Sequence, residues 1–117
     1  MSILSIILQV LLGLGFLMFG FMKFGSKQMV DEFGRYGLPG GFRVFTGLIE
    51  IIAAALVILG IWNTQLAAWG GLLIVATMAG AILTHIKVKD PANKMMMPIV
   101  LFILGLIVLL INFGSLI

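Results

Sequence analysis

Four long apolar stretches follow one another along the chain, separated by short polar segments. They predict membrane-spanning helices at about residues 3–23, 43–61, 65–86 and 95–113. Each stretch has close to the 20 or so residues that a helix needs to cross the hydrocarbon core of a bilayer. The turn between the second and third stretches is so short that these helices are expected to be antiparallel neighbours. We therefore expect an all-α membrane protein, an antiparallel four-transmembrane-helix bundle that forms one integral membrane domain over residues 1–117.

The segment between the first two spans has a different pattern. It predicts a short amphipathic, interfacial helix at about residues 26–36, too short to be a fifth span. Ser26 is a suitable N-cap, and Asp31 and Arg35 have the i, i+4 spacing of a helical ion pair. One side of this helix is expected to be apolar and to consist of Met29, Val30 and Phe33.

The positive charges are confined to two of the loops. All seven Lys and Arg residues lie after the first or after the third span: Lys23, Lys27, Arg35, Arg43, Lys87, Lys89 and Lys94. Loops rich in Lys and Arg stay on the cytoplasmic side of a membrane. We therefore expect a multi-pass protein of the cell membrane whose two termini are both extracytoplasmic.

Composition supports lipid as the main solvent of this chain. Hydrophobic residues make up 62% of it and charged residues only 9%, against about 25% charged in soluble domains. The formal charge of +3 is explained by the topology, so a nucleic-acid partner is not expected. The sequence has no cysteine and one histidine, so no metal or haem cofactor is expected either, and the run Met95–Met97 is interpreted as the start of a helix.

Glu50 is an acid inside the second apolar stretch, and it allows two interpretations. A carboxylate in this position costs roughly 2.5 kcal/mol or more unless it meets a partner or water. It can carry a proton or bind a ligand. Alternatively, it forms a structural ion pair with a nearby lysine or with Arg43, which lies on the same helical face two turns earlier.

Three further polar residues are expected at the same side of the membrane as the start of the second span. Lys23 ends the first span and His85 ends the third, and each has an ordinary role there: a snorkelling lysine and a histidine favoured by a helix C-terminus. Taken together they form a candidate ligand-binding cluster of Lys23, Arg43, Glu50 and His85. His85 shares a small, polar helix face with Thr77, and that face is expected to point inward.

Small residues recur four positions apart on the third span. Such spacing allows close contact between helices in lipid, and the pairs are Ala67 with Gly71 and Ala76 with Gly80. They predict either a homodimer interface or close packing within one bundle.

A set of short motifs resembles the DoxX-like family. In order along the chain they are Phe19–Gly20–x–x–Lys23, Tyr36–Gly37–Leu38–Pro39, Arg43–x–x–x–Gly47–x–x–Glu50, Leu59–Gly60 and His85. The resemblance implies a small four-helix membrane protein whose polar positions are Lys23, Arg43, Glu50 and His85. The family takes its name from subunits linked to membrane quinone redox complexes, and a related branch, resembling the receptor chaperone NACHO, assists the assembly of other membrane proteins.

Three functions remain open on this basis. The first is a redox-associated accessory subunit with a site for a quinone-like or other lipophilic ligand in the bundle. The second is an assembly or scaffold factor for a membrane-protein partner, and the third is a small proton-coupled exporter. Because the chain has no redox-active pair of side chains, no enzyme activity is expected of the isolated chain, and any redox cofactor would be an organic molecule such as a quinone.

The charge pattern gives a topology prediction. Reporter fusions or single-cysteine labelling at Ser2 and Ile117 should place both ends outside the cytoplasm, because neither terminal segment carries a Lys or Arg. Labelling of both ends from the cytoplasmic side alone would show that the assignment is inverted.

Overall fold

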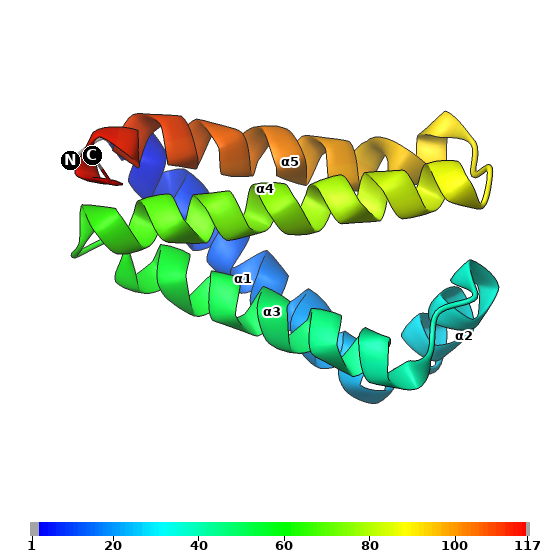
Figure 1. Cartoon of the computed structure of the whole chain (residues 1–117). Coiled ribbons are helices and arrows are strands. Elements are labelled where there is room, and N and C mark those ends of the chain that lie inside the picture. The colour runs from blue at the N-terminus through cyan, green and yellow to red at the C-terminus, as the bar shows by residue number, and fades with distance from the viewer. Residues whose placement is uncertain (1–2, 117) are drawn as a thin grey trace.

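The structure, a computed structural model, describes residues 3–116. The described part consists of four long helices, one short helix and a terminal 3-10 turn (Figure 1). In chain order these are α1 (Ile3–Gly25), α2 (Lys27–Tyr36), α3 (Gly40–Leu59), α4 (Thr64–Lys87), α5 (Ala92–Asn112) and η1 (Phe113–Leu116). The predicted fold class, a four-helix bundle with a short helix between its first two long helices, is confirmed.

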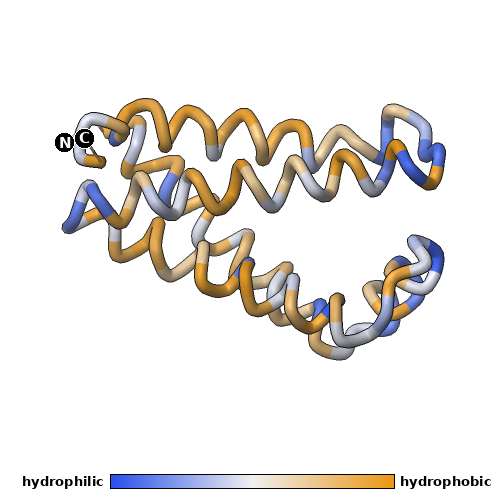
Figure 2. The backbone as a smooth tube through the Cα atoms, viewed as in Figure 1, coloured by the Kyte–Doolittle hydropathy of each residue, from blue (hydrophilic) through white to orange (hydrophobic). Residues whose placement is uncertain are grey.

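The four long helices are long and apolar enough to cross a membrane among the residues described. The 24 residues of α4 span about 36 Å at 1.5 Å per residue, which exceeds the roughly 30 Å of the hydrocarbon core. Figure 2 shows that hydrophobic residues run along these helices and that hydrophilic ones gather at the ends and on α2. The chain is therefore a multi-pass membrane protein.

The short helix α2 has the caps that its sequence predicts. The Ser26 hydroxyl accepts a hydrogen bond from the backbone N–H of Met29 at 3.2 Å. Gly37 ends the helix with a φ of 77°, a left-handed conformation that suits glycine. The expected apolar stripe is only partly correct: Phe33 is buried, whereas Val30 is 45% exposed.

The bundle is closed at one end and open at the other. At the end where η1 lies, small residues bring the backbones together: a β-carbon added at Gly70 would lie 2.9 Å from the Val57 nitrogen, and one at Gly71 would lie 2.8 Å from the Leu109 nitrogen. Towards α2, the pair α1 and α3 diverges from the pair α4 and α5 (Figure 1). In that half α3 carries the bulky Phe45, which lines the cavity described below, and it has no alanine before Ala53. Side-chain size therefore accounts for a bundle with a closed end and an open end.

Buried amides add polar links at the closed end. The Gln9 amide donates to the carbonyl oxygen of Val57 at 2.9 Å, which joins α1 to α3. Asn112 of α5 donates to the Ser5 hydroxyl of α1 at 3.0 Å, and Ser5 in turn donates to Gln9 at 2.7 Å. Hydrogen bonds between membrane helices contribute about 0.6 kcal/mol each on average, so the chain of three stabilises this end modestly.

The small residues of α4 divide into two pairs. Ala67 is fully buried, and Gly71 packs against the backbone of α5. Ala76 and Gly80 line a cavity described below. Packing within the bundle thus accounts for Ala67 and Gly71, whereas Ala76 and Gly80 are exposed, and the homodimer stays a prediction.

Close contact between α1 and α3 gives a stability prediction. A β-carbon at Gly47 would lie 2.7 Å from the carbonyl oxygen of Gly20, so Gly47→Ala should force the helices apart and destabilise the protein by about 1–3 kcal/mol. Gly15 of α1 meets nothing within 4 Å, and Gly15→Ala is the matched control, expected to be neutral or stabilising. Thermal unfolding in detergent measures both, and equal melting of the two variants would contradict the close contact.

Candidate functional site

A cavity of about 490 Å³ occupies the open half of the bundle. Its volume falls within the roughly 300–1,000 Å³ of small-molecule sites. All five helices contribute to its wall, which is largely apolar and includes Phe19, Phe45, Ile49, Leu73 and Leu101. A shallower groove lined by Leu56, Trp69 and Leu72 adjoins it and shares Leu73 and Ala76 with it. The cavity is thus separated by few residues from the outer surface between α3 and α4, which faces lipid.

An ion pair lies in the wall of this cavity. The ammonium nitrogen of Lys23 is 2.6 Å from Oε1 of Glu50, with the lysine side chain 14% exposed and the glutamate side chain 2% exposed. The two groups are not aligned as in a good hydrogen bond, but at this distance the charges are paired. The pair forms because Gly47, one turn before Glu50, lets α1 approach closely. The structure thus shows Glu50 in an ion pair, and its partner is Lys23.

Arg43 has a different partner from the one expected. Its guanidinium donates to the backbone carbonyl oxygen of Lys23 at 2.5 Å, and Arg43 is not among the described residues that line the cavity. The last carbonyls of a helix have no partner within the helix, and Lys23 lies in the last turn of α1. An arginine in the first turn of the adjacent α3 satisfies one of these carbonyls, which explains why it does not reach Glu50.

The polar face of α4 points into the cavity as predicted. Thr77, Gly80, Ala81, Thr84 and His85 all line it. Both threonine hydroxyls donate to carbonyls of their own helix, Thr77 to Leu73 at 2.7 Å and Thr84 to Gly80 at 2.8 Å. These hydroxyl oxygens can therefore only accept hydrogen bonds from a ligand in the cavity. Any hydrogen bond donated to such a ligand has to come from another residue. The cavity brings together three of the four predicted site residues, Lys23, Glu50 and His85.

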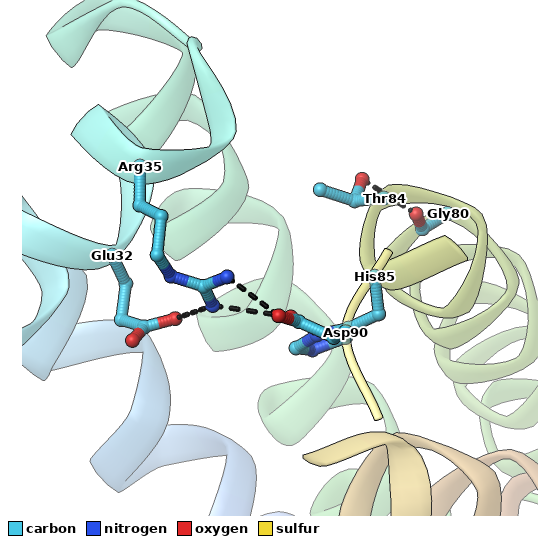
Figure 3. A network of polar contacts seen from close by, with 6 residues as sticks. All are labelled: Glu32, Arg35, Gly80, Thr84, His85 and Asp90. Carbon is cyan, nitrogen blue, oxygen red and sulfur yellow. Dashed lines mark hydrogen bonds and ion pairs between the residues drawn. The ribbon is translucent and has the colours of Figure 1, made fainter. Parts of the chain in front are cut away.

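A cluster of charged residues connects α2 to the turn between α4 and α5 (Figure 3). Arg35 makes two contacts with the Asp90 carboxylate, at 2.6 and 3.1 Å, and a third with Glu32 at 2.7 Å. Asp90 also lies 2.6 Å from Nδ1 of His85. We call Glu32, Arg35, His85 and Asp90 the latch, because they hold α2 against the α4–α5 hairpin. The predicted pairing of Arg35 with Asp31 is replaced by these contacts.

The latch meets the cavity at His85, which belongs to both. Tyr36 lines the cavity beside His85, with the two rings edge-to-face and their centroids 5.6 Å apart. Burial raises the pKa of Tyr36 to about 12, and Glu32 adds to this effect. The Tyr36 hydroxyl is therefore protonated at neutral pH and can donate a hydrogen bond.

Hydrogen bonds from Arg35, and then from His85, lower the pKa of Asp90 to about 2. Its carboxylate is thus ionised under ordinary conditions, and the latch remains charged. Sequence reasoning missed Asp90 because it lies 55 positions from Arg35 and stands in a polar turn where an acid is unremarkable. Tyr36 carried a signal, since it belongs to one of the motifs quoted above.

Comparison with known proteins gives one family and one relative. The DoxX-like family matches residues 7–108. The chain is 37% identical over 82 residues to the uncharacterized protein YdgD of Bacillus subtilis (strain 168), which covers 69% of this chain and 72% of that protein. No solved structure shows a significant match.

The ion pair gives a stability prediction. Glu50→Gln leaves the Lys23 ammonium unpaired in the bundle and should cost roughly 3–5 kcal/mol. Adding Lys23→Met should restore most of the loss, because no unpaired charge then remains. Adding Arg43→Gln to Glu50→Gln is the control and should restore nothing. Unfolding in detergent measures all three variants, and rescue by the arginine change alone would make Arg43 the partner.

The latch gives a pH prediction. The pKa of Asp90 is lower in the folded protein than the roughly 3.9 of an unfolded chain, so its contribution to stability is full above about pH 4 and is lost towards pH 2. Asp90→Asn should therefore lower the melting temperature at pH 6, and its difference from the wild type should shrink as the pH falls from 4 to 2. Asp31→Asn is the control. If the difference in melting temperature between Asp90→Asn and the wild type stays constant from pH 4 to pH 2, the ionised Asp90 carboxylate does not stabilise the contact between α2 and the α4–α5 hairpin.

Proposed function

The chain belongs to the DoxX-like family, and we propose that it is a membrane accessory subunit that binds a lipophilic, quinone-like molecule in the cavity between its two helix pairs. The observation that carries the proposal is a largely apolar cavity of about 490 Å³ with an ion pair and a polar helix face in its wall. Sites for small molecules combine apolar walls with a few placed polar groups in this way.

The position of the cavity supports a ligand that comes from the bilayer. It lies among helices that are apolar enough to span a membrane, and the groove that adjoins it carries the exposed residues Trp69 and Leu72. A molecule dissolved in lipid can reach this groove without crossing water. A water-soluble substrate would have to enter past α2 and the latch.

A quinone fits the residues of the cavity. Its ring would meet apolar side chains such as Phe45 and Leu101, and a carbonyl oxygen would accept a hydrogen bond from Lys23. When bound, the quinone would supply the redox chemistry, while this chain would bind it, orient it and shield it from water. Electron transfer would then require the partner protein to which the accessory subunit attaches.

The ion pair favours this proposal over a proton-coupled exporter. A proton carrier needs an acid that alternates between charged and neutral forms. Glu50 is 1% exposed and its carboxylate is paired with Lys23 at 2.6 Å, so it is not open to the exchange of protons with water. An assembly factor would use the outer surface of the helices and would leave the cavity without a role.

The test is to identify molecules that co-purify with the protein. We expect a lipophile at near-stoichiometric amount in the organic extract of protein purified in mild detergent. Gly80 lines the cavity and a β-carbon there meets nothing within 4 Å, so Gly80→Leu should fold and reduce the lipophile several-fold by filling its space. Gly15→Leu, which adds the same side chain outside the cavity, is the matched control.

Two results would contradict the proposal. A lipophile retained equally by both glycine variants would place the binding elsewhere. A partner protein that co-purifies without any lipophile would favour the assembly function.

A further inference from the structure

We infer that the cavity selects an uncharged amphiphile with a hydrogen-bond acceptor, such as a ketone or ester, and that Glu50 is the residue that excludes anionic amphiphiles. This inference rests on the proposed function and adds the chemical class of the ligand. It follows from the order in which the two charges face the cavity and from the charges around them.

The ammonium of Lys23 is the more accessible member of the ion pair. Its side chain is 14% exposed, while that of Glu50 is 2% exposed, and both residues line the cavity. A ligand therefore meets the lysine, with the carboxylate behind it. A lysine has three N–H donors, and its contact with Glu50 is a charge pair without the alignment of a good hydrogen bond. The ammonium can therefore donate a hydrogen bond to an acceptor oxygen of the ligand.

The charge of Lys23 is already compensated. Glu50 lies 2.6 Å from it and cancels its charge within the apolar wall. An anionic headgroup placed against Lys23 would therefore also lie close to the Glu50 carboxylate. Like charges at short range in a desolvated site cost several kcal/mol, whereas a neutral oxygen accepts the hydrogen bond without this cost.

The other charged groups do not change this balance. Arg43 donates to the backbone of Lys23 and is outside the lining of the cavity. At the α2 end, Arg35 is paired with both Glu32 and Asp90. Tyr36 is neutral there, since its pKa is about 12. His85 also lines the cavity, and its Nδ1 lies 2.6 Å from the Asp90 carboxylate, which would balance a charge on the ring. Lys23 is thus the cavity cation that Glu50 balances, and Glu50 determines whether it acts as a charge or as a hydrogen-bond donor.

The remaining wall fits an apolar chain. It is formed by side chains such as Phe19, Ile49 and Leu73, and Leu73 also lines the groove that holds Trp69. The threonine hydroxyls on α4 use their hydrogens within the helix, so they do not compete with Lys23 as donors. The expected ligand has one acceptor-bearing head beside Lys23 and an apolar remainder.

The experiment compares two probes of the same length. One is a pyrene-labelled alkyl methyl ketone, and the other is the matching pyrene-labelled alkyl sulfonate, which is anionic at every pH used. Binding to the purified full-length protein in nanodiscs of neutral lipid is measured by fluorescence. The wild type should bind the ketone at least about tenfold more tightly than the sulfonate.

Removing the carboxylate should change the selectivity. In Glu50→Gln no carboxylate balances the charge of the Lys23 ammonium. The affinity for the sulfonate should therefore rise relative to that for the ketone, and the ratio of ketone to sulfonate affinity should fall by at least about tenfold. Glu50→Asp keeps the charge and should retain the preference of the wild type. The double variant Lys23→Gln with Glu50→Gln has neither charge, and it should bind both probes weakly and show no gain for the sulfonate.

Separate outcomes test the inference and the proposed function. If the wild type binds neither probe, the proposed lipophile site is wrong and the inference fails with it. If the wild type binds both probes and Glu50→Gln leaves their ratio unchanged, the site stands and the selectivity role of Glu50 is wrong. Should Glu50→Gln not fold, the double variant Lys23→Met with Glu50→Gln decides, because it leaves no unpaired charge: it should weaken ketone binding by at least about fivefold, and unchanged binding would overturn the inference.

Discussion

The contact between the backbones of α1 and α3 is the constraint on which the site depends. Gly20 and Gly47 lie where the two helices are too close for a side chain on either one. A β-carbon at either glycine would lie within 2.8 Å of the carbonyl oxygen of the other. This short separation places Lys23 beside Glu50. A wider spacing would leave a carboxylate in the apolar bundle without a partner, at a cost that membrane helices rarely tolerate. Helix packing and electrostatics are thus coupled at a single point.

The open half of the bundle follows from a change of side-chain size along α3. Its later turns carry Ala53 and Ala54, which are buried against neighbouring helices, whereas its earlier turns carry Phe42 and Phe45, which are about half exposed. The same helix therefore belongs to a tightly packed core at one end and to a cavity wall at the other. The latch then holds α2 near the wide end through Arg35 and Asp90. The volume of the cavity reflects both effects.

Sequence reasoning recovered the elements of the fold but only part of the site. Hydrophobic length predicts the spans because a bilayer imposes it on each helix separately, and the cap at Ser26 is local in the same way. The partner of Glu50 was open because Arg43 shares its helical face, while Lys23 reaches it only through the fold. Asp90 had no local signal at all. Contacts between distant segments depend on how the helices pack, and the pattern of one chain does not contain that information.

The pairing of Lys23 with Glu50 has an electrical consequence for a protein in an energised membrane. The membrane potential does work of about 2.3 kcal/mol per elementary charge per 100 mV on a charge that crosses it. A site whose two charges cancel within 2.6 Å, occupied by an uncharged molecule, moves no net charge when the molecule enters or leaves. Its occupancy would follow the concentration of the ligand in the lipid and would be the same in a polarised and a depolarised cell.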